Sequence, residues 1–423
     1  MLAPAVKRKE TQKVMGTEFS LEREFWRAFT KSYWNRKPVL IRAPFPKPIA
    51  TPDDVFRGVV ATRRRLGSER DDLDLSLEGR KIVLDLDRWL PCAKDLSLTG
   101  YQSRLKRDGV PGQLAMLVNE FQSELGWTFY DRIRQFLHGL YEIVGVPARA
   151  EVDLFMGNYK RTPLGVHRDE AHVFVFVVEG RKQFRLWPKQ AFQSISHRYG
   201  PGPYTKYMKG SICLTGDPGD ILFWPSSYWH VAESDGQPGS SLTLGLYHGY
   251  SVFVALMKNL RQWYHTIAGD DRDPIGSLPF PNSQVPEEMS SIARRAEGRP
   301  GALTERLMRS WMETITGYGF ERIPRPPGGA SLRNTKGVRG NPISPILHWK
   351  FNGSLMISAN GRSIVVPNHR GIEKMLGKLS HGLVCEMGDS LAQGNGKSRR
   401  ASRRALRQTL DFLLEERALE PVQ

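Results

Sequence analysis

The stretch Gly165–Trp187 constrains the fold more than any other part of the chain. It reads GVHRDEAHVFVFVVEGRKQFRLW, and its apolar run Val173–Val178 is followed at once by a Glu179-Gly180 turn. A short apolar run that ends in a turn indicates a buried strand, with the chain returning through a second strand from Lys182. From residue 151 to about residue 250 the sequence continues as short β-runs separated by Gly and Pro, which predicts an antiparallel sandwich or barrel.

Three side chains in this β-rich region have the pattern of a metal site. His167 and Asp169 are two residues apart, so on a strand they share one face and can hold one ion together. The third candidate is His230, which follows the Asp220 turn, a strand over Ile221–Trp224 and a bend. A His-x-Asp pair alone occurs often by chance. Two histidines and one carboxylate together form the ligand set of non-haem Fe(II), which leaves positions open for a cosubstrate and dioxygen.

Composition limits where the protein acts and with what. A chain of 423 residues with 40% apolar residues predicts two or three globular domains. The formal charge of +17 indicates either an acidic partner, such as nucleic acid, the ribosome or an anionic peptide, or simply a basic surface. Three widely spaced Cys argue against a disulfide framework and for a reducing compartment. Because no long apolar run or signal peptide is found, we expect a cytoplasmic protein without membrane contact.

The spacing of these motifs resembles that of the JmjC (cupin-like) 2-oxoglutarate-dependent oxygenases, especially the ribosomal-protein oxygenases and related protein hydroxylases. In that family an H-x-D motif precedes an apolar strand, a G-x-K or G-x-R step, and a distal His after a Gly-Asp turn and a Pro. This chain reads His167-Arg168-Asp169, then Gly180-Arg181-Lys182, and Gly219-Asp220 with Pro225 before His230. The likeness covers roughly residues 17–250, and its motifs are most specific over residues 158–247.

The resemblance implies an Fe(II) centre formed by His167, Asp169 and His230, with 2-oxoglutarate and O2 as cosubstrates. Lys182 follows His167 by fifteen residues, where the family places the cation that pairs with the far carboxylate of 2-oxoglutarate. A paired charge makes the burial of that carboxylate tolerable. No catalytic side chain is expected beyond the metal ligands.

Further cosubstrate contacts are expected from two places. The strand Ser240–Tyr247 resembles the one where the family places hydroxyl groups; Thr243 shares a face with Ser241 and is favoured as the contact, although an ordinary strand threonine is equally consistent. Leu164 replaces a Thr that helps to hold the cosubstrate in some relatives, so Tyr159 or Asn158 is expected to substitute. His172, by contrast, falls on the opposite strand face and should line the pocket or pack.

The fold class predicted for the whole chain is α+β, with a double-stranded β-helix (jelly-roll, cupin-like) core. Helices are expected over Thr17–Trp34 and Phe129–Val144, and a strand over Lys81–Asp87. By analogy with the family, the helical region after the core carries dimerisation helices, which implies a homodimer. The expected segments are a disordered N-terminus (1–16), the N-terminal part of the JmjC region (17–150), the β-barrel core with the metal site (151–250), a helical region (251–322), a linker (323–345) and a small winged-helix-like domain with a basic C-terminal helix (346–423).

We therefore expect an enzyme, a dioxygenase that hydroxylates a side chain of a protein or peptide, a ribosomal protein among the candidates, with succinate and CO2 as co-products. One alternative is a non-catalytic cupin-like module that binds nucleic acid or protein. Another is an N-methyl demethylase with the same core. The complete triad together with Lys182 favours the enzyme. The basic C-terminal helix either contacts phosphate or is simply solvated.

Overall fold

The computed structural model describes residues 18–66, 72–82, 86–110, 112–192, 198–200, 204–248, 302–328, 335–386 and 396–422. The chain divides into two compact units, one comprising residues 1–249 with 318–328 and the other residues 250–317 with 329–423. Within the described ranges, no helix combines the length and the apolar character that crossing a membrane requires.

Two antiparallel sheets form the first unit. Within the described residues, the larger sheet has the strand order β1-β11-β7-β13-β5-β4-β2-β3 and the smaller sheet has the order β10-β8-β12-β6-β9. The larger sheet contains β1 (Val39–Ile41), β2 (Leu73–Leu77), β3 (Arg80–Lys81), β4 (Leu114–Val118), β5 (Arg149–Gly157), β7 (His172–Glu179), β11 (Ile221–Trp224) and β13 (Gly239–Tyr247). The smaller sheet contains β6 (Val166–His167), β8 (Lys182–Pro188), β9 (Arg198–Gly200), β10 (Ile212–Gly216) and β12 (Tyr228–Glu233).

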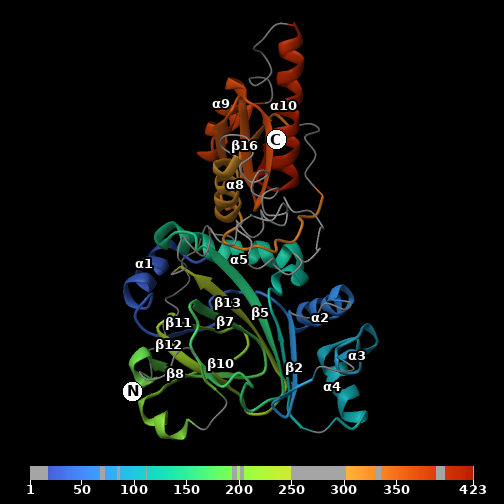
Figure 1. The fold of residues 1–423 in the computed structure, drawn as a ribbon, viewed down its shortest axis with the longest axis vertical. Coiled ribbons are helices and arrows are strands. Elements are labelled where there is room, and N and C mark those ends of the chain that lie inside the picture. Colours follow the sequence, from blue (N-terminus) through green and yellow to red (C-terminus); the bar gives the residue numbers. More distant parts are fainter. Residues whose placement is uncertain are drawn as a thin grey trace, which may run out of the picture. The chain divides into compact units, whose positions relative to one another are not determined.

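Strand β7 lies in the interior of the larger sheet and is apolar on both faces. Its even-numbered residues from Phe174 to Val178 belong to the core shared with the helices, whereas the odd-numbered residues from Val173 to Val177 belong to the core between the two sheets. Burial on both faces explains why this run is continuously apolar rather than alternating. Figure 1 shows α1 (Arg23–Ser32) and α5 (Gln122–Val144) on one side of β7 and β13, with β8 and β10 on the other. The predicted α+β class with a jelly-roll core is confirmed.

The predicted helices form, with shifted ends. The helix expected over Thr17–Trp34 is the shorter α1, and the next turn leads to Asn35, whose φ of 57° lies in the left-handed region. The helix expected over Phe129–Val144 extends back to Gln122 because two helices join across a break at Gly126 (φ 76°).

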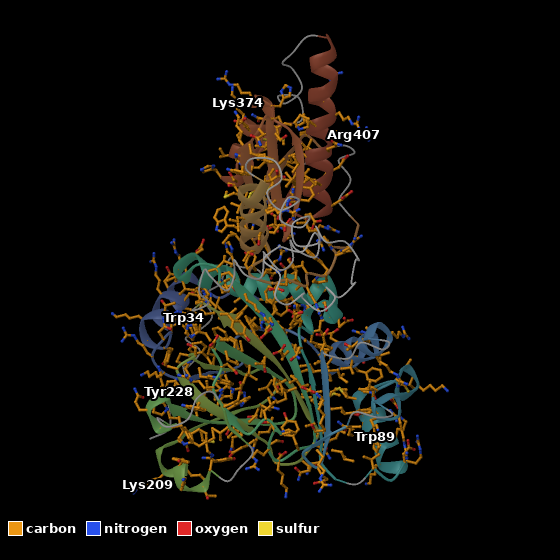
Figure 2. All side chains as sticks on the ribbon, viewed as in Figure 1. Trp34, Trp89, Lys209, Tyr228, Lys374 and Arg407 are labelled. Atoms are coloured by element: carbon orange, nitrogen blue, oxygen red, sulfur yellow. The ribbon has the colours of Figure 1, made fainter. Side chains whose placement is uncertain are left out.

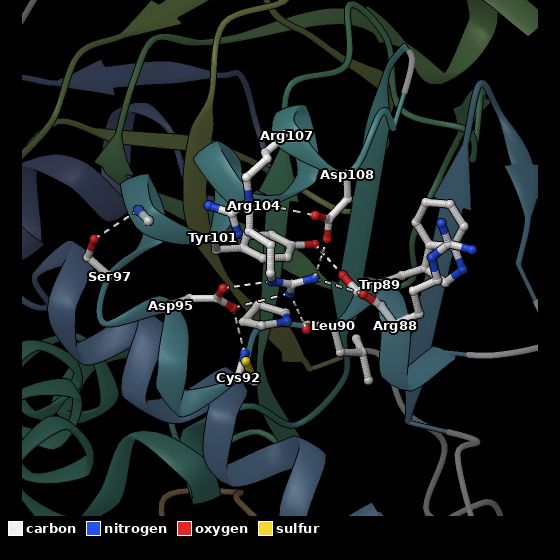
Figure 3. Close-up of polar contacts among 12 residues, drawn as sticks. Arg88, Trp89, Leu90, Cys92, Asp95, Ser97, Tyr101, Arg104, Arg107 and Asp108 are labelled. Atoms are coloured by element: carbon white, nitrogen blue, oxygen red, sulfur yellow. Dashed lines mark hydrogen bonds and ion pairs between the residues drawn. The ribbon is translucent and has the colours of Figure 1, made fainter.

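The strand expected over Lys81–Asp87 is wrong in extent, because β3 ends at Lys81 and the helix α3 (Leu86–Trp89) begins at Leu86. Beyond α3, a buried ion pair organises the chain. Arg104, in α4 (Leu98–Arg107), donates from Nε to Asp95 Oδ1 at 2.7 Å and from Nη2 to Leu90 O at 2.9 Å (Figure 3). Burial alone would raise the pKa of Asp95, but the hydrogen bonds from Arg104 and the Cys92 N–H bring it below its usual value. The alternating pattern of residues 81–87 carries no information about contacts between residues 95 and 104, so it could not indicate this ion pair.

The second unit is a smaller α+β structure with its own core. Helix α8 (Ala302–Thr316) packs on the sheet β15 (Leu347–Phe351), β16 (Ser354–Ala359) and β17 (Arg362–Pro367), and Thr316 Oγ1 lies 2.9 Å from Ser358 Oγ. The Asn352-Gly353 and Asn360-Gly361 pairs, which connect β15 to β16 and β16 to β17, all have positive φ, as tight hairpin turns require. The remaining elements are β14 (Gly337–Gly340), β18 (Cys385–Glu386), β19 (Leu419–Val422), α9 (Arg370–Ser380) and α10 (Gly396–Glu415).

The predicted segment boundaries differ in places from this arrangement. The range 323–345, expected to be a linker, contains β14, and residues 318–328 belong to the first unit. The N-terminal segment 1–16 and residues 251–301 of the expected helical region lie outside the described residues. The division of the chain into the six expected segments therefore stays a prediction.

Phe174 offers a direct test of the first core. Its side chain is fully buried and its ring lies within 6.3 Å, centre to centre, of Trp26, Phe29, Phe136 and Phe223. Phe174→Ala should lower the free energy of unfolding by about 3–5 kcal/mol, because the surrounding rings cannot collapse into the cavity. Met208→Ala, at a half-exposed site, should change it by less than about 0.5 kcal/mol. Guanidinium unfolding followed by tryptophan fluorescence measures both, and equal effects would contradict the assigned core.

Candidate metal centre and dicarboxylate pocket

The three candidate metal ligands come from two paired strands and the turn after one of them. His167 ends β6, and its direct cross-strand partner in β12 is His230. Asp169 Oδ2 lies 3.4 Å from His230 Nε2, and Asp169 Oδ1 lies 3.7 Å from His167 Nε2. One donor atom from each residue lies within 4.8 Å of the other two, so one ion can contact all three. The structure thus brings together the three residues named from the sequence.

The two imidazoles are held with their Nε2 atoms toward Asp169. His167 Nδ1 lies 3.0 Å from the carbonyl oxygen of Gly165, which can only accept, so the proton belongs on Nδ1 and the Nε2 lone pair stays available for a metal. Gly165 has φ 68°, and this turn therefore favours glycine. His230 is buried against the ring of Trp224, with ring centres 4.8 Å apart. A rigid, half-apolar setting of this kind fits a resident divalent ion.

Lys182 is a buried cation on the same interior face. It begins β8, and alternation places it on the side of Leu186, the β8 partner of His230. Its side chain is 5% exposed, donates a hydrogen bond to Tyr159 Oη, and has Nζ 4.5 Å from the centre of the Tyr159 ring. Among the residues that the structure describes, no carboxylate forms an ion pair with it. Burial without a compensating charge lowers the pKa of Lys182 to about 7.

Two hydroxyl groups that face the interior between the sheets have no hydrogen-bond partner among the described residues. Ser241 and Thr243 lie on β13, and their cross-strand partners on β7, Val177 and Val175, belong to the core between the sheets. The oxygen atoms of both hydroxyls are buried without a hydrogen-bond partner in the described part of the chain. Buried polar groups are normally satisfied. Two orphaned hydroxyls and an unpaired ammonium in one apolar interior therefore fit an anionic ligand, and a dicarboxylate fits the pair of charges at Lys182 and a metal.

Of the two residues expected to replace a cosubstrate contact, Tyr159 lies beside Lys182 and Asn158 does not. Tyr159 is buried against Lys182, which places it in the pocket. Asn158 is used elsewhere: its Oδ1 accepts from the Leu114 N–H at 2.7 Å and its Nδ2 donates to Gly112 O at 3.2 Å. Its side chain therefore ties the end of β5 to the start of β4, and the expectation of a cosubstrate contact finds no support.

His172 was expected to pack or line the pocket. It is 5% exposed, lies 4.1 Å from the Trp34 ring, centre to centre, and accepts from the Ser226 N–H at 3.3 Å. Burial, with a smaller effect of His248, lowers its pKa to about 4. His172 therefore packs as a neutral side chain, and is not among the grouped donors.

One residue of the interior was missed from the sequence. Asp153, on β5, is the cross-strand partner of Thr243, and its Oδ1 accepts from the Glu120 N–H at 3.0 Å. Burial, then the charge of Glu151 and, more weakly, that of Asp169 raise the pKa of Asp153 well above its usual value. A signal was present, because Asp153 has the parity of Phe155 in the predicted strand and so faces inward.

Removing the buried charge at Lys182 should change how stability depends on pH. Between pH 7 and about 10.5 the unfolded chain holds the lysine proton more tightly than the folded chain, so wild-type stability rises with pH. Lys182→Met has no ammonium to bury, so its free energy of unfolding at pH 6 should exceed that of wild type by roughly 2–4 kcal/mol. The difference should close toward pH 10. Urea unfolding at pH 6 and 9 without dicarboxylate measures it, and parallel pH profiles would refute the assignment.

Metal affinity tests the donor set. His230→Ala should weaken Co(II) binding at least about 100-fold, because one of three ligands is lost. His172→Ala, a buried histidine of the same sheet system, should leave the affinity within about threefold of wild type. Anaerobic titration followed by visible absorption compares the variants, and an unchanged spectrum in His230→Ala would remove His230 from the site.

Comparison with known proteins agrees with this site. Residues 116–252 match the model of the JmjC domain. Ribosomal oxygenase 2 of Rattus norvegicus is 23% identical over 339 residues, which cover 74% of this chain and 67% of the relative. The bifunctional lysine-specific demethylase and histidyl-hydroxylase NO66 of Culex quinquefasciatus is 23% identical over 236 residues, 52% of this chain and 32% of the relative.

Among solved structures, the ribosomal oxygenase YcfD of Escherichia coli aligns with a TM-score of 0.46 at 14% identity, covering 96% of this chain and 99% of that one. A second structure of YcfD, in complex with cobalt and 2-oxoglutarate, aligns with a TM-score of 0.45 at 14% identity, covering 93% and 97% of the two chains. The JmjC match spans β4 to β13 and contains each of the three grouped metal-binding side chains. Residues 116–252 are therefore similar to JmjC domains, and this similar part of the chain holds the candidate metal centre.

Proposed function

We propose that this protein is an Fe(II)- and 2-oxoglutarate-dependent dioxygenase that hydroxylates a side chain of a protein or peptide. The observation that carries the proposal is a two-histidine, one-carboxylate donor set in the same interior as the buried ammonium of Lys182, which forms no ion pair within the described residues. Fe(II) and 2-oxoglutarate, when bound, supply the activation of O2. One oxygen atom ends in the new C–OH group and the other in succinate, with release of CO2.

The residues of the chain have separate tasks in this reaction. His167, Asp169 and His230 hold the ion, and the Gly165 carbonyl keeps the His167 proton away from it. Lys182 binds the far carboxylate of the cosubstrate, and Ser241 and Thr243 donate their hydroxyl hydrogens toward it. The apolar wall formed by Val175, Phe184, Leu186 and Trp224 excludes water, which strengthens the interaction between the ammonium and the carboxylate.

An acidic wall, formed by Glu151 and Asp153 of β5, lies on the sheet face that also carries Thr243. Glu151 and Asp153 point inward from β5, and Glu151 is already held by Arg149 and by Tyr247 Oη. Asp153 accepts the Glu120 N–H at Oδ1. This wall supports a target that carries hydrogen-bond donors near the carbon to be oxidised. A ribosomal protein as its source is supported by the names of the relatives.

N-methyl demethylation is the second candidate, because one relative is named both a demethylase and a hydroxylase. Both reactions begin with the same oxidation, since a hydroxylated N-methyl group breaks down to formaldehyde and the amine. The non-catalytic module is disfavoured because each of the four residues needed for metal and dicarboxylate is present and faces the same interior. Homodimerisation through 251–322, phosphate contact by α10 and a cytoplasmic location remain proposals from the family resemblance and composition.

Turnover provides the direct test. With Fe(II), 2-oxoglutarate and a peptide pool from ribosomal proteins, wild type should form succinate and peptides heavier by 16 Da. Asp169→Ala, which retains both histidines but lacks the anionic ligand, should lose at least about 100-fold in rate. Methylated peptides that lose 14 Da with release of formaldehyde would establish demethylation instead. A protein that binds Co(II) normally but forms neither product from any pool would support the binding-module alternative.

A further inference from the structure

The second unit carries a basic surface made by one helix and the adjacent edge strand. Helix α9 buries Ile372, Met375, Leu376 and Leu379, so the opposite side of the helix faces solvent. Arg370, Lys374 and Lys378 lie on that side at intervals of four residues, and all three are exposed. His381 continues the row and is also exposed. Figure 2 shows Lys374 at the outer margin of this unit, directed away from the sheet.

The row continues onto β15, the edge strand beside α9. Lys350 Nζ lies 3.4 Å from Glu373 Oε1, and the charge of Glu373 also acts on His348. Burial of its ring lowers the pKa of His348, with Glu373 opposing that shift, so His348 adds little charge at neutral pH. The Glu373 carboxylate is thus paired with Lys350 of β15 and not with the cations of the α9 row. In the described part of the chain, Arg370, Lys374 and Lys378 form no ion pair.

The chemistry of this surface favours phosphate over protein. Lysine is depleted and aromatic side chains are enriched at protein–protein interfaces, whereas this row has two lysines, one arginine and no aromatic ring. The aromatic pair of β15, Trp349 and Phe351, stacks with ring centres 4.9 Å apart and has the opposite parity from Lys350, so it lies on the other face of the strand. Among the described residues, no aromatic ring lies on this surface to stack with a base, whereas three cations without ion pairs are available to phosphate groups.

The spacing also suits a polyanion. A separation of four residues along a helix is a rise of about 6 Å, so the row from Arg370 to Lys378 extends over about 12 Å. Double-helical nucleic acid carries a charge every ~1.7 Å along its axis, which offers several phosphates over that length. From residue 329 to the end of the chain there are fifteen Lys and Arg against seven Asp and Glu, so the surroundings add to the attraction.

We infer that the α9–β15 surface, defined by Arg370, Lys374, Lys378 and Lys350, binds the phosphate backbone of double-helical nucleic acid without reading its sequence. This surface is separate from the basic face of α10. In Figure 2, Lys374 and Arg407 lie on opposite flanks of the second unit. The inference does not depend on the proposed oxygenase chemistry, because none of these residues lies in the first unit.

The test is a salt titration with the full-length chain. Fluorescence anisotropy is measured with labelled 20-base-pair RNA and DNA duplexes from 50 to 200 mM KCl. The variant Arg370→Gln/Lys374→Gln/Lys378→Gln should weaken binding at least about tenfold at 100 mM KCl and reduce the slope of log K against log salt by about 3. Arg370→Lys/Lys374→Arg/Lys378→Arg, which keeps the charges, should retain both values.

Two matched controls make the result specific. Lys94→Gln/Lys106→Gln/Arg107→Gln removes the same charge from exposed residues of the first unit and should leave the slope unchanged. Arg403→Gln/Arg404→Gln/Arg407→Gln removes it from α10. The inference is overturned if neither duplex binds, if only the α10 variant loses the slope, or if polyglutamate binds as tightly as either duplex. Thermal melting of each variant, unchanged from wild type, shows that the exposed substitutions leave the fold intact.

Discussion

The antiparallel pairing of β12 with β6 is the constraint on which the functional part of the molecule depends. It places His230 directly opposite His167, although sixty-three positions separate them in the chain. Asp169 then needs only to follow the end of β6 to bring its carboxylate within 3.7 Å of both imidazoles. The same β12 pairs with β8, which fixes the side on which Lys182 emerges. One strand thus sets the geometry of the metal ligands and the direction of the cation.

The interior that these strands enclose is costly to keep without a ligand. Between apolar walls it holds the Lys182 ammonium with a lowered pKa, the Asp153 carboxyl with a raised pKa, and two hydroxyls that have no partner among the described residues. Burying each of these groups costs free energy, because water would solvate it better and an apolar group in its place would cost nothing to desolvate. Tyr159 relieves part of the cost by accepting a hydrogen bond from Lys182. A fold that keeps such groups close together is preorganised for an anionic ligand, which would satisfy them when it binds.

Much of this arrangement was predictable, and the failures have physical causes. The metal triad and Lys182 could be named because strand alternation and fixed spacing determine which side chains share a face. Asp153 was as accessible to the same argument but was passed over, since a lone acid in a strand has no motif. Asn158 could not be judged, because its partners Leu114 and Gly112 are over forty residues away. The strand expected over Lys81–Asp87 ends at Lys81, and α3 begins at Leu86, which the alternating pattern of these residues did not indicate.

The double burial of β7 has a consequence for how variation in this protein should be interpreted. Its even-numbered residues pack in the core shared with the helices, and its odd-numbered residues pack in the core between the two sheets. Neighbouring positions along this strand are therefore under different constraints. The even-numbered residues must pack against the helices, and the odd-numbered residues must pack between the two sheets. Substitutions at the odd-numbered positions should therefore disturb the packing between the two sheets, where the candidate metal centre lies. Substitutions at the even-numbered positions should instead disturb the core shared with the helices.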